Sequence, residues 1–149
     1  MAPDGGPGPQ AFQRRRGPPF RSGLAPWRLA RVEAFVADNL ARPLRLNDLA
    51  RAAGLSRMHF AAQFRATTGL PPHAYLVSCR IERAKALLSD TPLPLADIAC
   101  AVGFRSHSHF STVFRRRSGV APMQWRRRHA ARDDVDKAAS ADTTGAVGL

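Results

Sequence analysis

The strongest constraint on this chain is an internal repeat of about fifty residues. Leu49, Ala50 and Gly54 return 49 positions later as Ile98, Ala99 and Gly103. The residues that return at an offset of 50 are Ser56, Phe60, Phe64, Arg65, Gly69 and Pro72, as Ser106, Phe110, Phe114, Arg115, Gly119 and Pro122. One residue is inserted between Gly103 and Ser106, in a turn, where insertions are tolerated best. Each copy has the pattern of a helix-turn-helix, so the chain can present two recognition helices to one DNA duplex.

Apolar residues at helical spacing predict an all-α fold throughout the repeat region. Helices are expected at about residues 27–41, 46–53, 57–67, 72–89, 95–101, 107–117 and 123–128. Gly54 and Gly103 are expected in turns that need a positive φ, and Ser56 and Ser106 are expected to cap the helices that follow. The predicted apolar stripe of residues 72–89 contains Tyr75, Leu76, Cys79, Arg80, Arg83, Ala84, Leu87 and Leu88.

The predicted organisation is two helix-turn-helix subdomains joined by a long linker helix, between two disordered tails. The first motif is placed at about 46–67, the linker at about 72–89 and the second motif at about 95–117, inside a folded region of 27–128. Residues 1–26 are rich in Pro, Gly and Arg, and residues 129–149 lack periodicity, so both are predicted to be disordered. The arginine run at 14–16 is interpreted as a solvated tail, with a minor-groove arm as the alternative.

The charge is strongly basic and concentrated in the repeat. The net charge is +12, and residues 44–128 hold 14 Lys and Arg but only 4 Asp and Glu. Such a balance favours a polyanion as partner. No apolar run approaches the ~20 residues that span a bilayer, and the N-terminus lacks the apolar stretch of a signal peptide. The expected location is therefore the cytoplasm, at the nucleoid when the protein is bound to DNA.

The outward faces of the two predicted recognition helices supply the candidate DNA contacts. Phe60 and Phe110 are placed at the centres of the buried faces, and each following residue turns by ~100°. Small side chains admit a helix deep into the major groove, hydroxyls and Arg can hydrogen-bond base edges, and Met or Ala can touch thymine methyl groups. The base-contacting candidates are Met58, Ala61, Ala62, Arg65, His107, Ser108, Ser111, Thr112 and Arg115. The phosphate-contacting candidates are Ser56, Arg57, Arg105, Ser106, Arg116, Arg117 and Arg126.

Other chemistries are weakly supported. Cys79, Cys100, His107 and His109 do not have the spacing of a compact zinc module, and both cysteines fall on apolar helical stripes. The chain has no HExxH, phosphate-binding glycine loop or nucleophile elbow. We therefore expect no enzyme activity, metal or cofactor. The alternatives are a nonspecific, charge-driven nucleic-acid binder and a repair enzyme with a reactive cysteine.

The repeat region, about residues 27–128, resembles the DNA-binding domain of the AraC/XylS family of bacterial transcription regulators. The residues that match the family's second motif are Ile98, Ala99, Val102, Gly103, Phe104, Ser106, Ser108, Phe110, Phe114, Gly119, Pro122, Trp125 and Arg126. The family's linking-helix pattern is matched by Arg80, Ala84, Leu87 and Leu88. The resemblance implies a seven-helix domain that binds double-stranded DNA as a monomer, with RNA polymerase as partner and activation as the usual outcome.

The sequence departs from the family at two positions and in its extent. Many relatives carry Arg where this chain has Ala62 and Thr112, so its base reading is expected to depend more on His107, Ser108, Ser111 and the remaining arginines. The family's usual sensory domain is not in this sequence, which indicates either a compact member or a part of a larger regulator.

Overall fold

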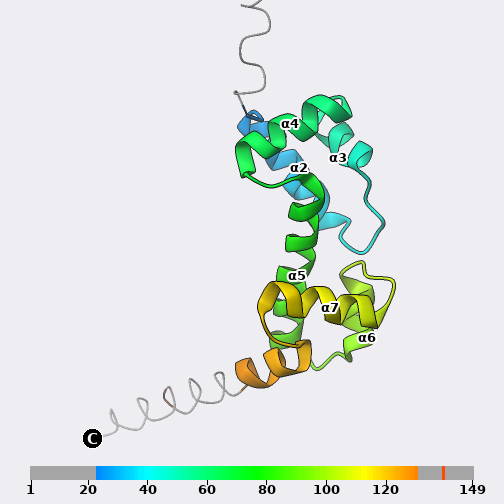
Figure 1. The fold of residues 1–149 in the computed structure, drawn as a ribbon, viewed down its shortest axis with the longest axis vertical. Coiled ribbons are helices and arrows are strands. Elements are labelled where there is room, and N and C mark those ends of the chain that lie inside the picture. Colours follow the sequence, from blue (N-terminus) through cyan, green and yellow to red (C-terminus); the bar gives the residue numbers. More distant parts are fainter. Residues whose placement is uncertain (1–22, 131–138, 140–149) are drawn as a thin grey trace, which may run out of the picture. The chain divides into compact units, whose positions relative to one another are not determined.

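The computed structural model describes residues 23–130 and residue 139, and shows two compact units (Figure 1). The helices are α2 (Pro26–Asp38), α3 (Leu46–Ala53), α4 (Arg57–Thr68), α5 (Pro72–Asp90), α6 (Leu95–Ala101) and α7 (His107–Ser118). Residues 122–130 are also helical. Of the described residues, the first unit holds 23–39 and 44–77, and the second holds 40–43 and 78–130. No strand occurs in this part of the chain, which confirms the all-α prediction.

The first unit is built around the phenylalanines of α4. α2 packs against α3, and α3 packs against α4. Phe60 and Phe64 are completely buried, with ring centroids 5.3 Å apart. Tyr75 of α5 meets the Phe64 ring edge-on at 5.1 Å. Aromatic side chains bury large apolar areas, so this cluster supplies much of the unit's hydrophobic stabilisation.

The second unit repeats this core with different partners. Phe110 and Phe114 of α7 are completely buried, 5.7 Å apart, and Phe104 packs on Phe110 at 5.4 Å. Trp125 meets the Phe114 ring edge-on at 6.1 Å. Tyr75 and Trp125, which are 50 residues apart in the sequence like the repeated residues, therefore occupy equivalent places in the two units.

The turns between the paired helices have the predicted geometry. Gly54 has φ +70° and Gly103 has φ +90°, which glycine adopts without steric cost. Gly103 is also enclosed: a Cβ there would collide with the Leu40 carbonyl oxygen and lie 2.9 Å from Nε of Arg80. Ser106 accepts a 3.0 Å hydrogen bond from the His109 N–H, and Ser56 accepts a longer one of 3.4 Å from the His59 N–H. Both N-caps are therefore confirmed.

The predicted tails extend too far into the folded region. Leu24 is only 6% exposed, and its N–H donates a 2.7 Å hydrogen bond to Oγ1 of Thr67. At the other end His129 is helical and stacks on Trp125 at 3.9 Å. The Leu24–Thr67 contact joins residues 43 positions apart, so local composition did not reveal it, whereas His129 stacks one helical turn from Trp125. The remaining tail predictions, the arginine run at 14–16 included, concern residues outside the described part.

Two predictions for helices need correction. α2 ends at Asp38 rather than residue 41, because the Asn39 N–H bonds to the Val36 carbonyl and closes the last turn. In α5, Ile81 is buried although the predicted stripe omitted it, whereas Arg83 is exposed. Residues 72–77 belong to the first unit and 78–90 to the second, and Leu76 lies ~140° around the helix from Ile81. The buried residues of α5 therefore do not form one continuous apolar stripe along the helix.

Candidate nucleic-acid interface

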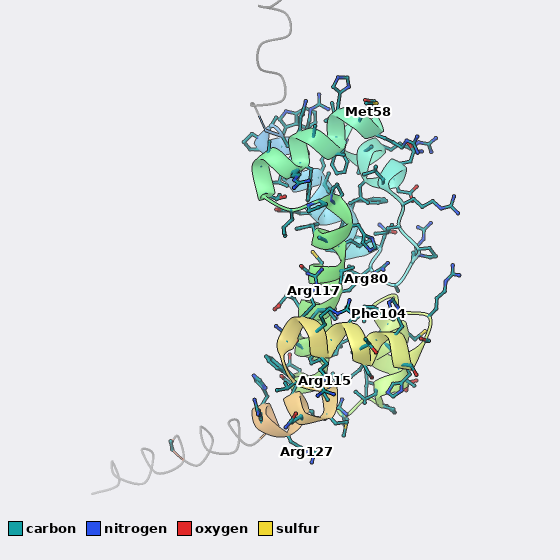
Figure 2. The ribbon with its side chains drawn as sticks, in the orientation of Figure 1. Met58, Arg80, Phe104, Arg115, Arg117 and Arg127 are labelled. Atoms are coloured by element: carbon teal, nitrogen blue, oxygen red, sulfur yellow. The ribbon has the colours of Figure 1, made fainter. Side chains whose placement is uncertain are left out.

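Helix α4 turns both apolar side chains, Met58 and Ala62, and basic side chains outward. With Phe60 and Phe64 buried in the core, Met58 projects from the first turn with 84% of its surface exposed (Figure 2). Arg65 is also exposed, and Ala62 is half-buried. An exposed methionine of this size contributes little to the core, so its side chain is available to a partner.

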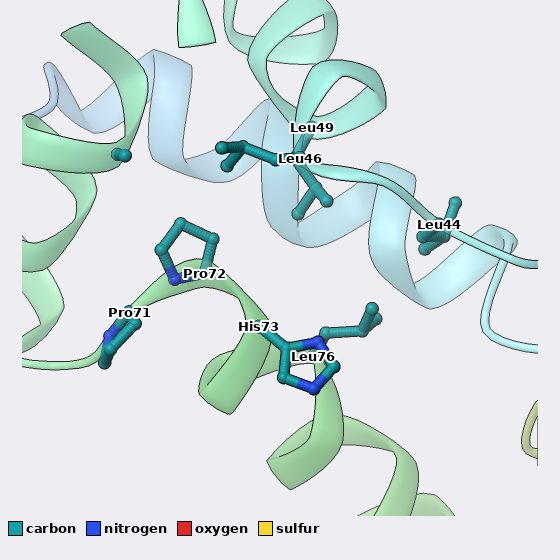
Figure 3. A pocket seen from close by; sticks show the side chains of 8 residues that line it. Leu44, Leu46, Leu49, Pro71, Pro72, His73 and Leu76 are labelled. Carbon is teal, nitrogen blue, oxygen red and sulfur yellow. The ribbon is translucent and has the colours of Figure 1, made fainter. Parts of the chain in front are cut away.

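Ala61 is oriented differently from the prediction. Its side chain lines an apolar hollow of about 180 Å³ within the first unit. The other residues around this hollow are Leu44, Leu46, Leu49, Pro71, Pro72, His73 and Leu76 (Figure 3). The 100° of rotation that separates Ala61 from Phe60 places it at the margin of the helix face rather than at its centre. Met58 and Ala62 are therefore the better placed apolar candidates on α4.

Helix α7 turns a polar face outward. His107, Ser108, Thr112 and Arg115 are exposed, and Ser111 is half-buried. The Thr112 hydroxyl donates a 3.0 Å hydrogen bond to the Ser108 carbonyl, which fixes its rotamer while leaving oxygen lone pairs as acceptors. Both faces therefore present an arginine, and α7 presents hydroxyls where α4 presents methyl and thioether groups.

The predicted phosphate contacts divide into two groups. Arg57, Arg105 and Arg116 are exposed, as a phosphate contact requires. Arg117 is exposed too, although its guanidinium donates a 2.7 Å hydrogen bond to the Ser78 hydroxyl. Ser56 and Ser106, predicted as phosphate contacts, are exposed and accept the hydrogen bonds that cap α4 and α7. The Ser56 hydroxyl also forms a 2.7 Å hydrogen bond with Nδ1 of His59, so only Ser106 keeps its O–H for a phosphate.

Arg126 has a structural role that the sequence did not indicate. Its guanidinium donates to three backbone carbonyls: Leu88 at 3.1 Å, Thr91 at 3.3 Å and Leu93 at 2.6 Å. Leu88 lies in the last turn of α5, where carbonyl groups lack intrahelical partners and a positive charge is favourable. Nε and Nη2 of Arg126 are thus committed to the fold, which makes it a poor phosphate contact.

Two further arginines stabilise backbone turns. Arg28 donates to the carbonyls of Ala53 and Gly54, at the end of α3. Arg80 donates a 3.0 Å hydrogen bond to the Arg42 carbonyl, and burial lowers the pKa of its guanidinium below the ordinary value. We call Arg28, Arg80 and Arg126 the structural arginines. Each one satisfies carbonyl groups that neither helix nor strand pairs.

The charge of the exposed arginines of α4 and α7 is not balanced by ion pairs. Between residues 23 and 130 one ion pair is formed, Lys85–Glu82 at 2.9 Å. In the same part of the chain no three His, Cys, Asp or Glu side chains are grouped to hold a metal ion. Among the described helices, none has the length and apolar character to cross a membrane.

The fold and this surface define a class: a DNA-binding domain with two helix-turn-helix units, each with a recognition helix anchored by two phenylalanines. The family model that matches the chain is described as a helix-turn-helix domain and covers residues 49–128. The chain belongs to the AraC-type family of helix-turn-helix transcription regulators.

Named relatives and solved structures agree with this assignment. The chain is 37% identical over 98 residues to the HTH-type transcriptional activator RhaR of Salmonella schwarzengrund, covering 66% of this chain and 35% of the relative. It is 33% identical over 99 residues to the melibiose operon regulatory protein of Escherichia coli, covering 66% and 33%. The chain thus spans about a third of the length of these relatives.

Two solved structures are similar over most of their own length. One is an AraC-type transcriptional regulator from Chromobacterium violaceum, with TM-score 0.66 and 30% identity, covering 69% of this chain and 92% of that one. The other is the DNA-binding domain of the transcriptional factor AdpA in complex with a target DNA, with TM-score 0.65 and 33% identity, covering 70% and 94%.

Proposed function

We propose that this protein regulates transcription by sequence-specific binding to double-stranded DNA, with α4 and α7 inserted into successive major grooves. The observation that supports this most is the repeated recognition helix. Arg65 and Arg115 stand at equivalent positions of α4 and α7, both exposed, each directly after a buried phenylalanine. An α-helix fits the major groove, where Arg recognises guanine by two hydrogen bonds.

The remaining roles are assigned by side-chain chemistry. We assign base contacts to Met58, Ala62 and Arg65 of α4, and to His107, Ser108, Ser111, Thr112 and Arg115 of α7. We assign phosphate contacts to Arg57, Arg105, Arg116 and Arg117, which are exposed and basic. Phosphate contacts set the register on the duplex, and base contacts set the sequence that is read.

The cellular role follows the relatives. RhaR is an activator by name, so we propose activation, with RNA polymerase as the protein partner, a monomer as the DNA-bound form and the bacterial nucleoid as the location. Two units on one chain can each occupy a groove, and successive major grooves are ~34–36 Å apart, so one copy suffices for an asymmetric site.

The test is selection of binding sites from random duplex DNA, followed by footprinting of the enriched sequence at physiological salt. We expect one asymmetric motif with two protected major-groove segments one helical turn apart. A motif of half that length would restrict base reading to one unit. No enrichment, together with an affinity that falls alike for all sequences as salt rises, would instead support a nonspecific charge-driven binder.

A further inference from the structure

The internal repeat allows the two recognition helices to be compared position by position. Met58 of α4 corresponds to Ser108 of α7, and Ala62 corresponds to Thr112, each at the repeat offset of 50. Arg65 and Arg115 are the shared residue of the two outer faces. The backbone around these positions is equally matched, because each helix has 12 residues, begins after a serine cap and ends at a glycine.

The chemistry at the matched positions is opposite. On α4, Met58 and Ala62 present only carbon and sulfur, so this part of the face forms no strong hydrogen bond with a base edge. On α7, the exposed Ser108 hydroxyl can donate or accept, whereas the exposed Thr112 hydroxyl donates to the Ser108 carbonyl and can accept from a base. Met58 and Ser108 are both exposed at the same position of helices of equal length, so the difference between them concerns what each helix touches rather than how it folds.

Thymine is the base that offers an apolar target in the major groove. Its C5-methyl group lies on the groove edge, and apolar side chains contact it. Met58 is 84% exposed, unbranched and polarizable, so it can adapt to the position of a methyl group. Ala62 is one helical turn further along the same face, and its small side chain leaves room for the base edge.

We propose that Met58 is a specificity-determining residue that reads thymine methyl groups, so that the two halves of the binding site are recognised by different chemistry. Apolar contact to thymine dominates the half bound by α4. Hydrogen bonds dominate the half bound by α7. This inference rests on the proposed function, because it requires that α4 enter the major groove.

The first experiment assigns the half-sites. The double variant M58S and A62T gives α4 the residues that α7 has at the same positions. Met58 is exposed and Ala62 lies outside the aromatic core, so we expect the variant to fold, which its circular dichroism spectrum verifies. Site selection with this variant is expected to change one half of the motif, which is then the half bound by α4. A motif unchanged in both halves overturns the proposal.

The second experiment removes methyl groups from the DNA alone. Each thymine in the assigned half is replaced by deoxyuridine, which keeps every hydrogen-bonding group and lacks only the C5-methyl. We expect the affinity of the natural protein to fall about fourfold for each contacted methyl, the value of one buried methyl-sized group. The variant Met58→Ala should bind thymine and deoxyuridine duplexes nearly alike, whereas the matched control Ser108→Ala should keep the full difference.

The outcomes separate this inference from the proposed function. If selection enriches no sequence, the proposed function fails and the inference fails with it. If a motif is enriched but its α4 half contains no thymine, tolerates deoxyuridine, or stays equally sensitive in Met58→Ala, only the inference is overturned.

Discussion

The substitution Gly103→Ala tests the close packing of the second helix-turn-helix. Alanine at this position would have to adopt φ +90°. A residue with a Cβ loses ~1–2 kcal/mol of stability in this left-handed region. Its Cβ would also collide with the Leu40 carbonyl and lie 2.9 Å from Nε of Arg80, whose guanidinium is bonded to the Arg42 carbonyl. Overpacking of this kind costs ~1–3 kcal/mol more. We expect a total loss of about 2–5 kcal/mol.

A matched control isolates the collision from the backbone strain. Gly119 has φ +81° in the same unit, and a Cβ there would have nothing within 4 Å. Gly119→Ala should therefore lose only the ~1–2 kcal/mol of the left-handed conformation. The free energy of unfolding of both variants and the natural protein is measured by urea titration, followed by helical circular dichroism.

The difference in the free energy of unfolding between the two variants tests whether Gly103 is enclosed. We expect Gly103→Ala to be less stable than Gly119→Ala by at least ~1 kcal/mol, the lower bound of the overpacking cost. Gly103→Val, which adds a β-branched side chain at the same position, should be at least as damaging. Losses equal within ~0.5 kcal/mol would show that Gly103 is not enclosed and would refute the packing described around Arg80.

Three further predictions concern stability and binding. Arg126→Ala should destabilise the second unit by at least about 2 kcal/mol, because a single hydrogen bond from a charged donor is worth ~1.5–3 kcal/mol and Arg126 makes three. The exposed Arg128→Ala should change urea stability by less than ~0.5 kcal/mol. Arg115→Ala and Arg65→Ala should each weaken binding to the selected DNA site by ~1–3 kcal/mol, measured by fluorescence anisotropy, and should relax the base preference at one position of that site. An unchanged base preference in both variants would refute the placement of these arginines in the major groove. Ser106→Ala should cost ~1 kcal/mol of stability through loss of the 3.0 Å cap to His109, and an unchanged urea midpoint would refute the cap.

Much of the candidate site was predictable from the sequence, because the spacing of apolar residues within one helix determines which of its side chains are exposed. Burial of Phe60 and Phe110 fixes the rotation of each helix, and exposure of Met58, Arg65 and Arg115 follows from 100° per residue. Ala61 shows the limit of this reasoning. It lies at the margin of the face, and only the packing of α3 and the start of α5 next to it formed a hollow there.

The sequence by itself determined the helices, their caps and their turns, because these depend on residues within a few positions of one another. The spacing of apolar residues, a serine at each N-cap and a glycine with positive φ at each turn act locally, and the structure confirms them at α4 and α7. Only the tertiary structure decided which arginines serve the fold. Arg28 and Arg126 bond to carbonyls 25 to 38 positions away, and a pattern of near neighbours does not encode such partners. A guanidinium can donate hydrogen bonds to a phosphate or to a bare carbonyl, so its role in this fold is set by what packing brings within reach.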